Sequence, residues 1–305
     1  VKVVKLESVF KNQPTKVTFK KSDITTGVEL SGATLTVLDK DGNVVDTWKS
    51  VKGEEHLIER LTAGETYTLR EEMAPYGYLM AEEITFTVED TAEIQKVEMK
   101  DDVPIGRIII NKKGEFLSEV SWNDMVAGAM DSIWGYVTGS LKDVTFEIYA
   151  REDIKAADGE SDDYYKKDEL VATIKTDELG IARTDDLPLG KYYVVEKETA
   201  DGFVLDGEPR DIDLTYRDQD TPVVTFDSEW ADSPLPGNSR QKAKVIVTKK
   251  EKDSDRVLEG GVFALCAKED IKNTDGDVLV KADTIMEQKA TDKDGKIFFT
   301  ADLPV

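Results

Sequence analysis

The sequence has little of the residue types that most catalytic and metal sites need. Among its 305 residues there is one cysteine, Cys266, and one histidine, His56. A single cysteine excludes a disulfide within the chain and a cysteine-rich metal site. A single histidine leaves almost no material for Ser–His or Cys–His catalysis, or for a histidine-rich metal centre. The sequence therefore predicts a protein that needs no metal or cofactor and is not an enzyme with turnover.

Positive charge and long apolar runs are also scarce. The chain has 40 basic against 63 acidic residues, a net charge of −23. Nucleic acids and anionic membranes bind to basic surfaces, so we expect neither as a partner. No apolar run approaches the roughly 18 residues of a membrane-spanning helix. No signal peptide is recognisable and the chain starts abruptly at Val1, so we expect a fragment of a longer protein.

One short pattern recurs along the chain. Each copy is an alternating strand that carries a lysine, followed by a polar turn and a second alternating strand, and the copies lie at 17–41, 108–150 and 245–267. Self-similarity of this kind indicates an array of like modules. A period of roughly 90 to 140 residues is that of small domains and not of solenoid turns.

Within the copies, apolar residues alternate with a period of two, which is typical of half-buried strands. About seven short strands separated by turns predict an all-β fold of tandem immunoglobulin-like or prealbumin-like β-sandwiches. We predict the last strand of a preceding module at 1–12, a first module at 13–103, a second module at 104–240 and the incomplete N-terminal part of a third module at 241–305. An incomplete module has an open sheet edge, so the third should need a partner chain.

The second module carries an insertion at 118–138. Its apolar residues recur every three to four positions, at Trp122, Val126, Met130, Ile133 and Val137. This spacing predicts an amphipathic helix that packs on the sandwich or on a neighbour. Exposure of both Trp122 and Trp134 would favour an adhesive surface, whereas burial of both against the sheet would favour a structural role.

Ionisable side chains occupy inward-facing positions of the first module. Lys21, Glu71 and Asp101 are each in phase with the apolar residues of their own strands. Lysine and acidic residues are almost never fully buried unless they are paired. A buried ion pair is one explanation, although such a pair is often no more stabilising than apolar packing.

At these residues the sequence resembles the Cna B-type (prealbumin-like, SpaA-like) domains of Gram-positive surface adhesins and pilins. The matching segments are the strand around Lys21, Leu30-Ser31-Gly32-Ala33, the strand 67–71 with the turn 74–78 (APYGY), and Met99-Lys100-Asp101. In that family the lysine, the glutamate and a final-strand Asn or Asp form a spontaneous intramolecular isopeptide bond. The resemblance thus implies a Lys21–Asp101 cross-link with Glu71 as its catalytic residue.

The same resemblance extends to the second module. Lys112 and Glu196 match the lysine and the glutamate, although the proline of the turn is lost. Two acceptors remain open: Asp232 ends an alternating strand, whereas Asn238 precedes Lys249 by the spacing that separates the first acceptor from Lys112. Prolines between the two candidates should interrupt the strand, so Asp232 is narrowly preferred.

Two further residues stay unpaired in this interpretation. Lys249, in the third copy, has no matching glutamate or acceptor within the chain, and Asn12 resembles the acceptor of a preceding module. The resemblance implies an extracellular stalk or pilus-like segment, anchored to a Gram-positive cell wall, whose partners are the neighbouring modules of the same chain. The alternative is that the modules themselves bind a host protein or glycan.

Overall fold

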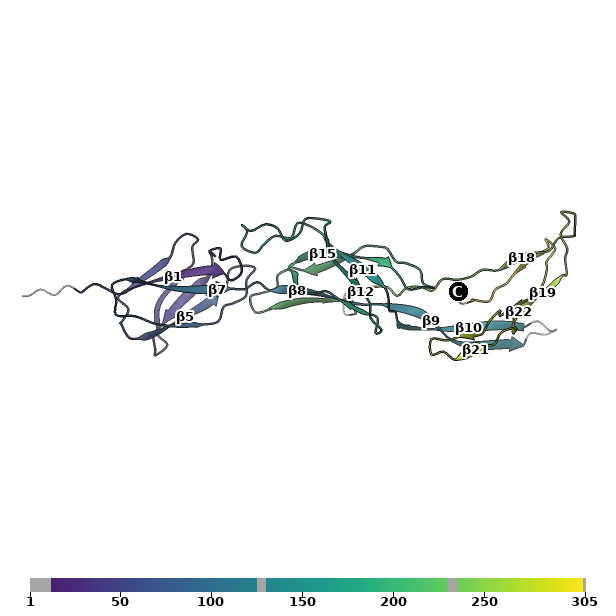
Figure 1. Cartoon of the computed structure of the whole chain (residues 1–305), viewed down its shortest axis with the longest axis horizontal. Helices are drawn as coiled ribbons and strands as arrows, with labels where there is room; N and C mark the ends of the chain where they lie inside the picture. Colours follow the sequence, from purple (N-terminus) through teal and green to yellow (C-terminus); the bar gives the residue numbers. More distant parts are fainter. Residues whose placement is uncertain (1–11, 125–129, 230–234, 304–305) are drawn as a thin grey trace, which may run out of the picture.

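A computed structural model describes residues 12–124, 130–229 and 235–303. All the regular secondary structure in these ranges is β-strand, and the strands form sandwich-like units that follow one another along an elongated molecule (Figure 1). In the described residues no helix is long and apolar enough to cross a membrane. The prediction of an all-β fold is therefore confirmed, while the limits of the modules stay a prediction.

The first module consists of two facing sheets, with strand orders β4-β1-β7 and β3-β2-β5-β6. The strands are β1 (Lys16–Asp23), β2 (Thr34–Leu38), β3 (Val44–Lys49), β4 (His56–Glu59), β5 (Thr66–Met73), β6 (Ile84–Thr87) and β7 (Ile94–Asp101). Alternate residues of β1, β2 and β5 fill the space between the sheets, where Phe19, Leu35 and Leu69 are buried. Strand β1 pairs in parallel with β7, so the first and last strands of the module are neighbours.

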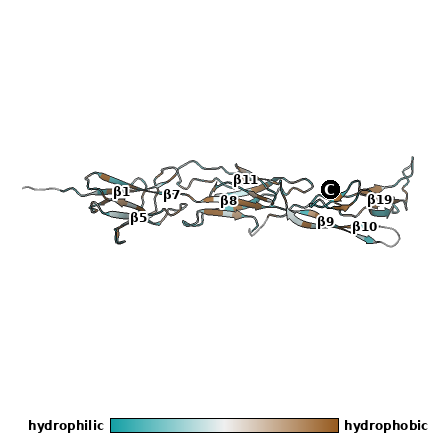
Figure 2. Cartoon of the chain, turned by 60° about the horizontal axis from the view of Figure 1, so that its bottom comes forward, coloured by the Kyte–Doolittle hydropathy of each residue, from teal (hydrophilic) through white to brown (hydrophobic). Residues whose placement is uncertain are grey.

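The second module repeats this plan. Its sheets have the orders β13-β8-β14, with β17 also paired to β8, and β12-β11-β15-β16. The strands are β8 (Ile105–Asn111), β11 (Thr145–Ala150), β12 (Leu170–Lys175), β13 (Ile181–Arg183), β14 (Leu187–Pro188), β15 (Gly190–Glu198), β16 (Arg210–Leu214) and β17 (Val223–Asp227). Strands β8 and β11 are largely hydrophobic and contribute to one core cluster (Figure 2). Strand β17 pairs in parallel with β8, as β7 pairs with β1.

The predicted helical insertion at 118–138 is wrong. Two long strands, β9 (Lys113–Asp124) and β10 (Met130–Ser140), form an antiparallel hairpin there. The apparent helical period omitted Trp134 and Tyr136, which alternate with the exposed Ile133 and Val137 along one strand. Aromatic and β-branched residues favour strands, and Gly135 and Gly139 disfavour a helix, so the local preferences agree with the hairpin.

The hairpin belongs to two modules at once. It starts directly after the second module's first strand, and its strand β10 pairs with β22 of the third module, Asp131 lying opposite Glu287. The combined sheet has the order β19-β22-β10-β9 (Figure 1). The remaining strands are β18 (Ile246–Thr248), β19 (Val262–Cys266), β20 (Ile271–Lys272), β21 (Val278–Val280), β22 (Ile285–Ala290) and β23 (Lys296–Phe298).

The third module repeats a side-chain hydrogen bond of the second module. Thr176 follows β12 and donates its hydroxyl hydrogen to the carbonyl oxygen of Leu141 at 2.9 Å. Thr291 follows β22 and donates in the same way to the carbonyl oxygen of Leu258 at 2.7 Å. Strand β22 is thus the counterpart of β12, an edge strand in the second module, and the hairpin covers that edge in the third. Within the described residues β19 is paired on one side only.

Candidate functional site

The first candidate site is a buried cluster of one amine and two carboxyl groups. Lys21 lies on β1, Glu71 on β5 and Asp101 at the end of β7, and all three side chains are buried. The Nζ of Lys21 lies 2.9 Å from Oε1 of Glu71 and is in contact with Oδ1 of Asp101. The structure thus brings together the three residues that the sequence singled out in this module.

The parallel register of β1 and β7 positions the acceptor. Asp101 lies opposite Asp23, two residues beyond Lys21, so it faces the same side of the sheet as the lysine. Asp23 is itself buried and accepts a hydrogen bond of 2.9 Å from the hydroxyl of Tyr78. Glu71 is held by the backbone amide of Ala81, which donates to Oε2 at 2.7 Å.

The electrostatics of this cluster favour an uncharged acceptor. Burial raises the pKa of Asp101 to about 7, and the positive charge of Lys21 opposes that rise. At neutral pH a large fraction of Asp101 is therefore the carboxylic acid. Its Oδ2 is buried and has no hydrogen-bond partner among the described residues.

The second candidate site has the same elements with an amide in place of one acid. Lys112 directly follows β8, Glu196 lies on β15, and both are buried together with Asn238. Oε2 of Glu196 lies 2.8 Å from Nζ of Lys112. Oε1 of the same carboxyl group accepts a hydrogen bond of 2.5 Å from Nδ2 of Asn238. One carboxyl group therefore bridges the amine and the amide.

Asn238 occupies the place in the register that Asp101 holds in the first module. It forms a parallel bridge with Gly114, two residues beyond Lys112, and its backbone amide donates to the carbonyl oxygen of Lys113 at 2.8 Å. Strand β17 ends at Asp227, so this pairing begins again after an interruption. The sequence interpretation expects the prolines to interrupt the strand and places the acceptor before them, which is why Asn238 ranks second; in the structure the pairing resumes beyond the interruption. Asp232, ranked first, lies outside the described residues.

The two sites differ in the residues at two matched positions beside the acceptor. Where the first module has Asp23 and Tyr78, the second has Gly114 and Phe203. The ring of Phe203 lies so close to Gly114 that a Cβ there would be 2.5 Å from Cε1. The first site thus has a hydrogen bond between Asp23 and Tyr78, whereas at the matched place in the second site the ring of Phe203 packs directly on the backbone of Gly114.

The other predicted residues lie apart from any such cluster. Lys249 is exposed, and its Nζ lies 5.8 Å from the ring centroid of Phe263. Asn12 is also exposed. The sequence interpretation missed Thr199, three residues after Glu196, whose Oγ1 accepts a hydrogen bond of 2.6 Å from Nδ2 of Asn238. The only sequence signal for it is a hydroxyl residue where the first module has Ala74.

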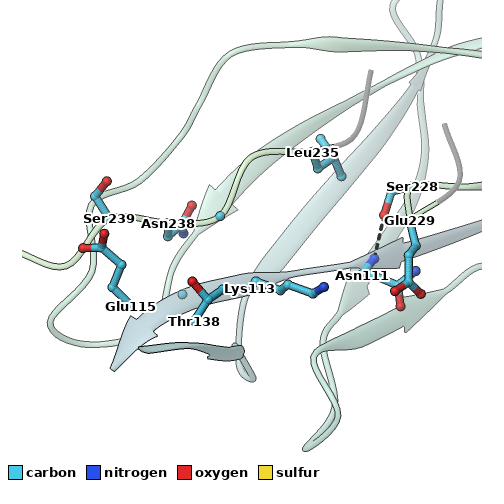
Figure 3. Close-up of a pocket in the computed structure, with 11 residues that line it drawn as sticks. Asn111, Lys113, Glu115, Thr138, Ser228, Glu229, Leu235, Asn238 and Ser239 are labelled. Carbon is cyan, nitrogen blue, oxygen red and sulfur yellow. Dashed lines mark hydrogen bonds between the residues drawn. The ribbon is translucent and has the colours of Figure 1, made fainter. Parts of the chain in front are cut away.

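A cavity of about 370 Å³ borders the second site (Figure 3). Asn238 and Leu235 line it on one side, and Asn111, Lys113 and Thr138 on the other. The described residues contain no group of three or more His, Cys, Asp or Glu side chains that could hold a metal ion. Each of the two sites holds an amine, a carboxyl group and an acyl group as a possible acceptor.

The family of the chain follows from a comparison with protein-family models. The model of the SpaA prealbumin-like fold domain matches residues 15–103 and 136–230, together more than half of the chain. The chain belongs to this family. No curated protein matches the chain.

Solved structures are similar to the chain at low sequence identity. The TIE protein of Bacillus anthracis has a TM-score of 0.58 and 19% identity, with 94% of this chain and 43% of that chain covered. A streptococcal ancillary pilin has a TM-score of 0.29 and 16% identity, with coverages of 76% and 64%. BcpA, the major pilin subunit of Bacillus cereus, has a TM-score of 0.28 and 12% identity, with coverages of 75% and 100%. The chain thus spans less than half the length of the TIE protein, and its likeness to that protein shows the fold alone.

Proposed function

We propose that the chain is part of the stalk of a Gram-positive cell-surface protein or pilus, and that its first two modules cross-link themselves by isopeptide bonds. The bonds join Lys21 to Asp101 and Lys112 to Asn238. One observation carries the proposal: a buried lysine, a buried glutamate and a buried acyl acceptor occur together twice, at equivalent places in the register.

The chemistry is a condensation that needs no cofactor. Nζ of Lys21 attacks the side-chain carbonyl carbon of Asp101 and water leaves, whereas attack by Lys112 on Asn238 releases ammonia. The attacking form of each lysine is the neutral amine, and burial raises the pKa of Asp101, which favours its carboxylic acid, the better electrophile. The neighbouring glutamate accepts a proton from the amine and delivers one to the leaving group. Fixed placement of the reacting groups lowers the barrier further.

The position of each bond suits a stalk. Each one ties the first strand of a module to a segment beside it that comes late in the module, so a force applied along the chain meets a covalent bond before the hydrogen bonds of the sheet. Such modules need no turnover, and we assign them no enzymatic activity.

The junction between the first two modules also supports an extended stalk. Gln219 accepts a hydrogen bond from the amide of Ala74 through its side chain and another from the amide of Met80 through its backbone, both at 3.0 Å. The hydroxyl of Tyr216 donates to the carbonyl oxygen of Tyr78 at 3.1 Å. This loop of the second module is thus hydrogen-bonded to the turn that follows Glu71 in the first module. The segment expected to carry an adhesive patch pairs with the third module's sheet instead, which favours the stalk over direct host binding.

Intact mass with peptide mapping tests the proposal and assigns the second acceptor. The unsubstituted chain is expected to weigh about 35 Da less than its sequence, about 18 Da from water and about 17 Da from ammonia. Asn238→Ala should restore the 17 Da, whereas Asp232→Ala should not. A wild-type mass equal to that of the sequence would overturn the cross-links, and restoration by Asp232→Ala alone would overturn the choice of Asn238.

The two bonds are expected to form with different pH dependence. The carboxylic acid is the reactive form of Asp101, and with a pKa of about 7 its population should fall about fivefold between pH 7 and pH 8. The amide of Asn238 does not titrate in this range. In timed cell-free synthesis, the rate of water loss relative to ammonia loss should therefore fall as the pH rises through 7. Parallel pH profiles for the two losses would contradict the assignment.

A further inference from the structure

We propose that Thr199 is a positioning residue for the second cross-link, holding the leaving nitrogen of Asn238. This inference rests on the proposed cross-link and deepens it. It assigns a role to a side chain that touches the acceptor but is absent from the matching position of the first module.

The hydrogen bonds of the amide nitrogen carry the inference. A carboxamide nitrogen has two hydrogens, and Nδ2 of Asn238 donates to Oε1 of Glu196 at 2.5 Å and to Oγ1 of Thr199 at 2.6 Å. Both donors are therefore used, and they are used in a site where Asn238 and Glu196 are buried. Oδ1 of Asn238 has no hydrogen-bond partner among the described residues, so the observed contacts orient the amide through its nitrogen.

The comparison between modules shows that the hydroxyl accompanies the amide. Thr199 is three residues after Glu196, and the residue three after Glu71 is Ala74, which has no polar side chain. The acceptor beside Ala74 is Asp101, and a carboxyl group has no leaving nitrogen to hold.

The reaction gives this contact a defined purpose. The Nζ–Cγ bond forms between Lys112 and Asn238 while the Cγ–Nδ2 bond breaks. Nζ loses one proton to Oε2 of Glu196 as it attacks. In the tetrahedral intermediate the lone pair of Nδ2 becomes available and takes one proton from this carboxyl group, so that ammonia leaves and the carboxylate is regenerated. By accepting the second hydrogen bond of Nδ2, Thr199 holds this nitrogen beside the carboxyl group that protonates it.

The test compares Thr199→Val with Thr199→Ser in the full chain. Valine keeps the shape of threonine but removes the hydroxyl, whereas serine keeps the hydroxyl. Timed cell-free synthesis, stopped by acid and followed by intact mass, should show ammonia loss slowed roughly 3- to 10-fold by valine and close to the wild-type rate with serine. Water loss from the first module, measured in the same molecules, should be unchanged and serves as the internal control for folding.

A second set of variants, made in the Asn238→Asp chain, distinguishes an effect of Thr199 on the leaving nitrogen from an effect on packing. In Asn238→Asp the leaving group is water and no Nδ2 is present, so adding Thr199→Val should slow that reaction less than twofold. Equal slowing in both backgrounds, equal slowing by valine and serine, or no slowing by valine would each overturn the role of Thr199. If the Asn238→Asp background does not react, the valine–serine comparison decides alone. Failure of the wild-type chain to lose ammonia would instead overturn the proposed cross-link itself.

Discussion

Replacing Glu71 with glutamine is expected to leave Lys21 and Asp101 unlinked and to lower the thermal unfolding temperature of the first module by roughly 20–35 °C. The bond closes a loop between residues separated by 80 positions in sequence. Treated as a cross-link on the unfolded chain, a loop of this length contributes about 4.5 kcal/mol of stability. For a domain of this size, 1 kcal/mol shifts the midpoint by about 4–8 °C. Glutamine cannot carry the proton between amine and acceptor, so the bond should not form.

Glutamine is chosen because it preserves the local packing. Its side-chain oxygen can still accept the hydrogen bond that the amide of Ala81 donates to Glu71. The matched control is Glu72→Gln, which makes the same change on the next, exposed residue and should alter neither the water loss, measured against the mass of its own sequence, nor the midpoint. Calorimetry and intact mass on the same samples provide the readout. Full water loss in Glu71→Gln would contradict the catalytic role of Glu71, and an unlinked variant with the wild-type midpoint would contradict the expected thermal stabilisation by the bond.

Much of the first site could be predicted from the sequence because it lies within continuous strands. The period of two alone indicates that Lys21, Glu71 and Asp101 point inward, and the structure places their side chains in one cluster. The second acceptor could not be predicted with equal certainty, because the pairing that positions Asn238 resumes beyond an interruption in the strand. The alternation of inward and outward residues can be followed only along a continuous strand. An interruption breaks this alternation, so the sequence beyond it no longer indicates which residues pair.

The hairpin shows a different limit of sequence reasoning. A segment with apolar residues at both odd and even positions fits a helical period if only some of these residues are counted. The spacing that predicts a helix at 118–138 does not include Trp134. Pairing decides between strand and helix: β10 pairs along its length with its hairpin neighbour β9, and its second partner, β22, lies about 150 residues further along the chain, where Asp131 faces Glu287. Likewise nothing in the local sequence indicates that Cζ of Arg240 lies 3.7 Å from the ring centroid of Tyr136, about 100 residues earlier in the chain.

Trp134→Ala is expected to destabilise the third module by about 3–5 kcal/mol while the first cross-linked module keeps its midpoint. Trp134 is buried in a cluster that it shares with Met286 and Val280 of the third module. Strand β22 is the counterpart of an edge strand, so the hairpin covers an edge that would otherwise present unpaired backbone groups. Removing the indole therefore leaves a cavity between the hairpin and the sheet that it completes.

Hydrogen exchange resolved by peptide gives the local readout. Amides of β19 and β22 should exchange faster in Trp134→Ala, whereas those of β1 and β7 should not change. Trp122→Ala is the matched control, because this second hairpin tryptophan is 38% exposed while Trp134 is 7% exposed. Tyr136→Phe tests the contact between the hairpin and the third module by removing a single hydrogen bond, which the hydroxyl of Tyr136 donates to the carbonyl oxygen of Asp302 at 2.7 Å. No destabilisation of the third module by Trp134→Ala, or an effect no larger than that of Trp122→Ala, would contradict the role of the buried indole in bracing this module.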